Sequence, residues 1–100
     1  MATIEVRKTE RFEAWLRRLS DLNARARIQA RIDRLALGNP GDVRPVGGGV
    51  SEMRIDYGPG YRVYYVRQAF HVVLLLCGGD KHSQAEDIRT AKRMAKEVRE

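Results

Sequence analysis

The sequence has very little cysteine and histidine, and it has no long apolar run. Cys77 is the single cysteine, and the chain contains two histidines. An intramolecular disulfide is therefore impossible and a zinc site of cysteine and histidine ligands cannot be assembled, so we expect no metal or other cofactor. No apolar segment approaches the ~20 residues of a membrane span, and the N-terminus has no apolar stretch of the signal-peptide kind. These absences favour a protein of the reducing cytoplasm.

The position of the lone cysteine indicates a structural role. Cys77 directly follows the apolar run of residues 72–76. An apolar environment disfavours the reactive thiolate, so a buried thiol is favoured over a nucleophile.

Length and net charge limit what kind of protein this is. One hundred residues support a single modest core, so we expect one domain spanning residues 1–100. Lys and Arg number 19 against 13 Asp and Glu, which gives a formal charge of +6. Most of the cations are arginine, whose fixed charge and planar fork suit phosphate groups. The balance favours a polyanionic partner, and a well-solvated basic surface is the alternative.

The N-terminal part predicts one strand and a helical hairpin. Alternation over residues 3–7 indicates a strand. Thr9 can cap a first helix, and Asp21 can cap a second helix that Gly38 ends. The inward apolar positions are Phe12, Trp15, Leu16 and Leu19 in the first helix and Leu22, Ala24, Ile28, Ile32 and Leu35 in the second.

The remainder predicts a loop, three strands and a helix. Residues 39–49 are dense in glycine and proline, which indicates a loop. Ser83 and Glu86 predict a capping box for a final helix. Strands are expected over about residues 50–57, 61–67 and 70–77. The order βααβββα predicts an α+β fold with a mostly antiparallel sheet, helices packed on one face and the other face at least partly open.

The most informative segment is the hairpin of residues 52–65, which turns at Gly58-Pro59-Gly60. Glycine reaches positive φ without strain and proline presets its own φ, so these residues predict a three-residue loop. On one face, that loop would pair Tyr57 with Tyr61, Ile55 with Val63 and Met53 with Tyr65. On the other face, it would pair Asp56 with Arg62, Arg54 with Tyr64 and Glu52 with Val66.

The hairpin is part of a pattern that resembles the RelE/ParE superfamily of small bacterial toxins, in particular its HigB-like branch, the addiction module killer proteins. The resemblance covers nearly the whole chain. It rests on Phe12 and Trp15-Leu16, on residues 38–42, 52–65 and 78–81, and on Gln84, Asp87-Ile88 and Ala91. It implies a toxin of a type II toxin–antitoxin system that cleaves mRNA on the ribosome, inhibits translation and growth, and is neutralised by a cognate antitoxin. In this branch the antitoxin is typically a helix-turn-helix protein encoded beside the toxin.

The residues expected to carry such chemistry are mostly basic. In metal-independent RNA cleavage the ribose 2′-OH attacks the adjacent phosphate, so the catalyst must neutralise the phosphate and move protons. We expect Arg54, Arg62 and Lys81 to serve the phosphate, and Arg62 matches the resembled toxins most clearly. His82 is the expected proton carrier. The expected RNA-binding residues are Tyr64, which would stack on a base or hold a phosphate, Arg67 and Arg44.

Three alternatives stay open at this point. Several of the resembled toxins carry a tyrosine or histidine near the C-terminal end, and none follows Ser83 here, so the general base could be Glu52, His82 or ribosomal RNA. Arg62 could instead form a cross-strand ion pair with Asp56, worth only ~0.2–1 kcal/mol when exposed. A ParE-like toxin that binds DNA gyrase without cutting RNA is the other function that the resemblance allows.

Overall fold

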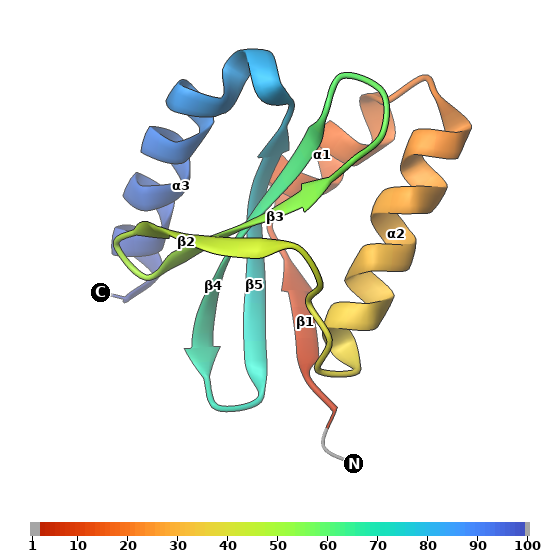
Figure 1. Cartoon of the computed structure of the whole chain (residues 1–100). Coiled ribbons are helices and arrows are strands. Elements are labelled where there is room, and N and C mark those ends of the chain that lie inside the picture. Colours follow the sequence, from red (N-terminus) through yellow and green to blue (C-terminus); the bar gives the residue numbers. More distant parts are fainter. Residues whose placement is uncertain (1–2, 100) are drawn as a thin grey trace.

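Within residues 3–99, which the computed structural model describes, five strands form one sheet (Figure 1). They are β1 (Glu5–Lys8), β2 (Val43–Gly47), β3 (Val50–Ile55), β4 (Tyr61–Ala69) and β5 (Val72–Gly79). Their order across the sheet is β1-β5-β4-β3-β2. β1 runs parallel to β5, and the other neighbouring strands are antiparallel. The antiparallel strands follow one another along the chain, so short turns are enough to join them.

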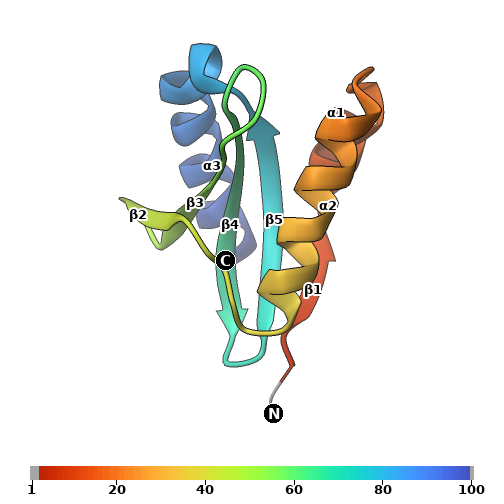
Figure 2. The same cartoon turned by 45° about the vertical axis from the view of Figure 1, so that its right-hand side comes forward.

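Two helices cover one face of the sheet and a third covers the other, as the turned view in Figure 2 shows. They are α1 (Glu10–Arg18), α2 (Leu22–Ala36) and α3 (Gln84–Arg99), and a 3-10 turn, Lys81–Ser83, precedes α3. None of the described helices is both long and apolar enough to cross a membrane. The predicted α+β class is confirmed, but the prediction that the helices pack on one face is wrong.

The interior strand β5 explains why both faces are covered. Val73 and Leu75 lie in the core beneath α1 and α2, whereas Leu74 and Leu76 lie in the core that α3 closes with Ala91 and other residues. A strand that is apolar on both faces is stable only where both faces are protected from water. α3 therefore closes much of the face that was expected to be open.

Side-chain caps set the starts of the first two helices. Thr9 Oγ1 accepts a hydrogen bond from the Phe12 N–H at 3.0 Å. Asp21 Oδ1 accepts from the N–H groups of Asn23 and Ala24 at 2.9 and 3.2 Å. Both predicted N-caps are confirmed, and Gly38, at φ +88°, follows the end of α2 as expected.

The last helix is capped earlier than predicted. Asp80 Oδ1 accepts from the N–H groups of His82 and Ser83 at 2.8 and 3.3 Å, and the Asp80 N–H donates to Ser83 Oγ at 3.4 Å. The capping box therefore joins Asp80 with Ser83, and the predicted pairing of Ser83 with Glu86 is wrong. Asp80 lies three residues before Ser83 and caps the 3-10 turn. Ser83 is therefore already inside that turn and is not itself the N-cap.

β2 lies within the segment that was predicted to be a loop. Val43 pairs with Met53, and Arg44 pairs with Glu52. As the edge strand, β2 tolerates Pro45, which has no N–H to donate. Glycines with positive φ follow at residues 47–49, where the chain turns into β3. The glycine and proline content that suggested a loop thus belongs to a strand edge and a tight turn.

The register of the β3–β4 hairpin differs from the prediction by two residues. Ile55 pairs with Tyr61, and Arg54 pairs with Arg62. The loop has five residues rather than three, because the Tyr57 N–H donates to the Ile55 carbonyl and the Gly60 N–H donates to the Tyr57 carbonyl within it. A two-residue shift keeps every side chain on its predicted face, since the strand period is two. The predicted opposition of Asp56 and Arg62 is wrong.

The lone thiol is buried, as predicted. Cys77 Sγ lies 3.8 Å from the Asp87 carbonyl oxygen, to which it donates. Burial raises the pKa of the Cys77 thiol to about 12. The thiol therefore stays protonated near neutral pH and packs as part of the core.

A close contact between Gly78 and Trp15 leads to a test of this packing. A Cβ at position 78 would lie 2.3 Å from Cε3 of the Trp15 ring. Gly78→Ala should therefore lower the free energy of unfolding by about 1–3 kcal/mol, the usual cost of overpacking, as measured by urea denaturation. Combined with Trp15→Leu, which removes the ring, the substitution should cost clearly less than alone; strictly additive costs would contradict the contact.

Candidate functional site

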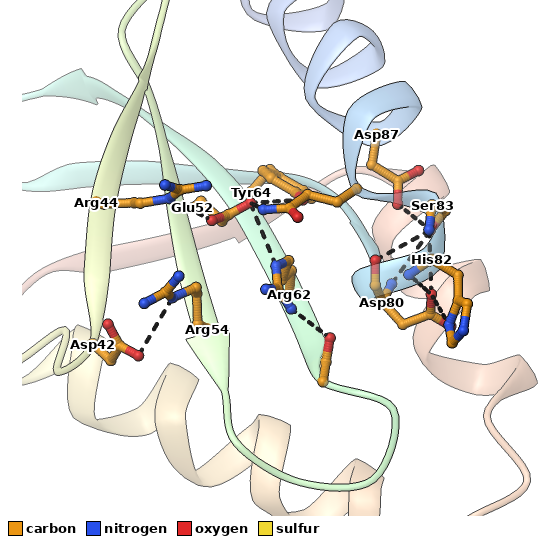
Figure 3. Close-up of polar contacts among 12 residues, drawn as sticks. Asp42, Arg44, Glu52, Arg54, Arg62, Tyr64, Asp80, His82, Ser83 and Asp87 are labelled. Carbon is orange, nitrogen blue, oxygen red and sulfur yellow. Dashed lines mark hydrogen bonds and ion pairs between the residues drawn. The ribbon is translucent and has the colours of Figure 1, made fainter.

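A completely buried carboxylate, that of Glu52 on β3, lies at the centre of the site (Figure 3). Its Oε1 accepts a hydrogen bond from Arg44 Nε at 2.9 Å. Its Oε2 accepts from the Tyr64 hydroxyl at 3.0 Å and from Gln84 Nε2 at 2.9 Å, and Arg62 Nε lies 3.6 Å from it. The carboxylate thus connects β3 with β2, β4 and α3.

These contacts keep Glu52 ionised. Burial alone would raise the pKa of its carboxyl group, but the hydrogen bonds from Gln84, Arg44 and Tyr64 outweigh burial and hold the pKa below its usual value. Burial and the hydrogen bond to Glu52 raise the pKa of Tyr64. The Tyr64 hydroxyl therefore stays protonated and remains a donor to the carboxylate.

Tyr64 does not have the environment expected for an RNA-stacking residue. Its ring is completely buried in the core that includes Ala91 and Ala95 of α3. A buried ring offers no face to a nucleobase. Its place in the structure makes it a support for Glu52.

Arg62 is held from two sides. Its Nη1 donates to the Gly60 carbonyl oxygen at 2.7 Å, and its Nε faces Glu52. The Arg62 side chain is only 11% exposed, and its ionic partner is the buried Glu52. The alternative suggested by the sequence, an exposed ion pair with Asp56, is not formed. Gly60 is needed here, because it has φ +83° and a Cβ would lie 3.3 Å from Arg62 Nη1.

A hollow of about 370 Å³ opens beside Arg62. It brings together Arg54 from β3, Arg62 from β4 and Lys81 from the turn before α3. The full lining is Asp42, Arg54, Ile55, Asp56, Gly60, Arg62 and Lys81. We call this space the first hollow. Its lining includes the three basic side chains that the sequence analysis predicted to contact phosphate.

The two arginines of the first hollow lie directly opposite each other across β3 and β4. Like charges in such a pair destabilise a sheet. Asp42 offsets one of them, since its Oδ2 lies 3.5 Å from Arg54 Nε, and Glu52 offsets the other. Glu52 is shared with Arg44, however, and Lys81 adds a further charge. The arrangement is suited to binding an anion.

The turn that carries Lys81 is braced against the sheet. Ser83 Oγ donates to Asp87 Oδ2. Asp87 packs on Gly79, where a Cβ would lie 1.8 Å from Oδ2, so only glycine permits this approach. Burial raises the pKa of Asp87. Because Gly79 pairs with Arg62 across the sheet, this packing sets Lys81 beside the Arg62 strand.

Besides the buried Tyr64, three of the nominated residues do not line the first hollow. The His82 side chain is 87% exposed, with Nδ1 3.6 Å from Asp80 Oδ1. Arg67 donates to the Phe70 carbonyl at the opposite end of β4. Arg44 lies next to the hollow, bonded to Glu52 and half exposed. Sequence reasoning missed Asp42, because its segment was taken for a free loop.

The described acids and histidines limit the chemistry of the site. Glu52 is poorly placed to take a proton from a ligand, because it is completely buried and both its oxygens are hydrogen-bonded. The carboxylates that line the first hollow are those of Asp42 and Asp56. In the part of the chain that the structure describes, no three His, Cys, Asp or Glu side chains are grouped so that they could hold a metal ion.

Comparison with known proteins gives a family and a fold. Residues 14–98 match the model of the family described as phage-derived protein Gp49-like. An uncharacterised protein of Haemophilus influenzae is 50% identical over 96 residues, which are 96% of this chain and 97% of that protein. The free-state structure of a doubly substituted E. coli toxin RelE superposes with a TM-score of 0.72 at 16% identity, covering 94% of this chain and 97% of that one. The fold is therefore that of RelE.

The charge of Glu52 can be tested through the pH dependence of stability. Its pKa in the folded protein is below that of the unfolded chain, near ~4.3, so its stabilisation is complete above that pH and is lost as the pH falls through the folded value. Glu52→Gln should lower the free energy of unfolding by about 1–3 kcal/mol at pH 7. The deficit should shrink below about pH 4, measured by denaturant titration across pH.

The exposed Glu97→Gln on α3 is the matched control and should change stability little at any pH. A deficit for Glu52→Gln that stays constant from neutral to acid pH would show that the carboxyl group does not titrate as described.

Proposed function

This chain belongs to the phage-derived Gp49-like family, and from that membership, the RelE fold and the first hollow we propose that it is a toxin of a type II toxin–antitoxin pair that cleaves mRNA on the ribosome. The observation that carries the proposal is the meeting of Arg54, Arg62 and Lys81 in one hollow. A phosphodiester group is an anion of the right chemistry for two guanidinium groups and an ammonium group.

In the proposed reaction the ribose 2′-OH attacks the adjacent phosphorus, and the 5′ oxygen of the next nucleotide leaves. Arg62 contributes most, because its hydrogen bond to Gly60 and its ion pair with Glu52 fix its orientation before the substrate arrives. Such a pre-organised charge stabilises the transition state more than the ground state. Arg54 and Lys81 neutralise the remaining phosphate oxygens.

The site has fewer groups suited to proton transfer than groups suited to phosphate binding. His82 lies outside the first hollow, and Glu52 is buried and bonded. Asp56 lines the hollow and has no hydrogen bond or ion pair with another described residue, so we assign it as the general base on this chain. We propose that the ribosome supplies the alignment of the 2′-OH.

The proposed partners are mRNA, the ribosome and a cognate antitoxin. We assign the protein to the HigB-like branch, whose antitoxins are typically helix-turn-helix proteins encoded next to the toxin. The formal charge of +6 supports both an RNA target and an acidic partner. The proposed site of action is the cytoplasm, where ribosomes are found.

Arg62→Ala tests the proposed site directly. The substitution should lower mRNA cleavage about 10²–10³-fold, the effect of losing one transition-state charge contact, and abolish growth arrest on induction. Glu52 keeps its bonds to Arg44, Tyr64 and Gln84, so the variant should remain folded by circular dichroism. Primer extension on mRNA from induced cells measures the cleavage as new 5′ ends within codons.

Arg89→Ala is the matched control, because it removes an exposed arginine of α3 that does not line the first hollow, and this variant should stay toxic. A folded Arg62→Ala variant with full toxicity would refute the site. Intact mRNA together with a supercoiling defect in cells that express the wild-type chain would instead support a ParE-like inhibitor of gyrase.

Purified protein without ribosomes should bind single-stranded RNA but cut it poorly. Binding should weaken as salt rises, with a slope of about −0.7 per phosphate contact in a plot of log K against log salt concentration. Cleavage on ribosomes should persist in EDTA at a concentration that leaves the ribosomes intact, and a fluorescent oligonucleotide reports cutting in their absence. Rapid cleavage of the bare oligonucleotide would show that the chain holds a complete acid–base pair.

A further inference from the structure

A second hollow, of about 300 Å³, lies between α2 and the end of β3. Its lining is Arg27, Ala30, Arg31, Arg34, Ile55 and Asp56. Ile55 and Asp56 also line the first hollow, so the two spaces are neighbours on either side of a shared wall. An RNA strand bound in the first hollow could therefore continue into the second hollow along the protein surface.

The spacing of the arginines on α2 creates this second basic surface. Arg27, Arg31 and Arg34 are four and three residues apart, so they lie on one face of the helix. Ala30, which has the smallest side chain of the lining residues, leaves the space between them open. The one carboxylate in the lining is that of Asp56 in the shared wall.

Two of these arginines are positioned by neutral groups. Arg31 donates to the carbonyl oxygens of Arg54 and Pro40 at 2.6 and 2.9 Å, and it forms no ion pair among residues 3–99. The Arg27 guanidinium lies 4.6 Å from the centre of the Tyr57 ring. Tyr57 in turn donates to Asp21 Oδ2 at 3.0 Å, which anchors the ring to the start of α2. The positive charges are therefore fixed in place without being neutralised.

We propose that the second hollow binds the nucleotides next to the cleaved phosphate on the same RNA strand. The proposal rests on the proposed function of the first hollow, to which it adds a subsite for the flanking backbone. Arg34 contacts a flanking phosphate, Arg31 adds its fixed charge to the lining, and Arg27, with one side on Tyr57, offers the other side of its guanidinium plane to a base. Single-stranded RNA is favoured over a protein segment, because three of the six lining residues are arginines and one is an acid, a charge balance that suits a phosphate backbone.

The test compares RNA probes of two lengths. Fluorescein-labelled oligouridylates of two and eight nucleotides are titrated with purified protein over a salt series, and binding is followed by anisotropy. The wild-type chain should prefer the octamer. Arg27→Ala/Arg34→Ala should reduce that preference about tenfold, as expected for a lost charged hydrogen bond, and lower the salt slope for the octamer by about 0.7, the value for the one phosphate contact made by Arg34. Ala30→Leu, which fills the hollow without changing the charge, should also reduce the preference.

The matched control is Arg89→Ala/Arg93→Ala, which removes the same charge from exposed positions of α3 and should leave the preference for the octamer intact. An equal loss in both double variants would show a general charge effect and overturn the subsite. Unchanged octamer binding by the α2 variant, with loss of binding to the co-expressed antitoxin, would assign the surface to a protein partner instead.

These outcomes are separable from failure of the proposed function. If the wild-type protein prefers the octamer but does not cleave ribosome-bound mRNA, the nuclease assignment is overturned. RNA binding across both hollows is then still supported. The flanking subsite alone is overturned by another result. In that result cleavage depends on Arg62, but the preference for the octamer is unchanged in both Arg27→Ala/Arg34→Ala and Ala30→Leu.

Discussion

The buried charge of Glu52 is the interaction on which the rest of the structure depends. A carboxylate without solvent is costly unless it is paired and hydrogen-bonded. Glu52 obtains its partners from three separate elements, through Arg44 on β2, Tyr64 on β4 and Gln84 on α3. The edge strand, the central hairpin and the last helix are therefore held in fixed relative positions by one side chain.

The same carboxylate links the fold to the proposed chemistry. Arg62 is oriented by Glu52 on one side and by the Gly60 carbonyl on the other, and it opens into the first hollow. Placing Arg54 directly across from it costs stability, which is a recurring feature of functional sites. The ion pair between Asp42 and Arg54 offsets part of this cost. The two arginines can therefore face each other without a bound anion, and the first hollow remains basic.

Neutral partners help to position three arginines of this surface, although Arg62 also faces Glu52 and Arg54 faces Asp42. Carbonyl oxygens hold Arg31 and Arg62, and an aromatic ring holds Arg27. A carboxylate partner would fix the side chain equally well but would compete with phosphate for its charge. Positioning by carbonyls and rings keeps the guanidinium groups ordered and their charge available, which suits a chain proposed to bind the RNA backbone over several nucleotides.

The sequence by itself determined the features that depend on neighbours along the chain. The caps at Thr9 and Asp21, the alternation of the hairpin and the burial of Cys77 follow from local hydrogen bonding and hydrophobic pattern, and even the two-residue error in register left each side chain on its predicted face. The meeting of Arg54, Arg62 and Lys81 was also predicted. Only the tertiary structure decided that α3 covers the second face, that β2 forms an edge strand and that Glu52 is buried while Tyr64 supports it. These outcomes depend on contacts between residues far apart in the sequence, because whether a polar side chain is buried depends on which element packs over it and which partners arrive with that element.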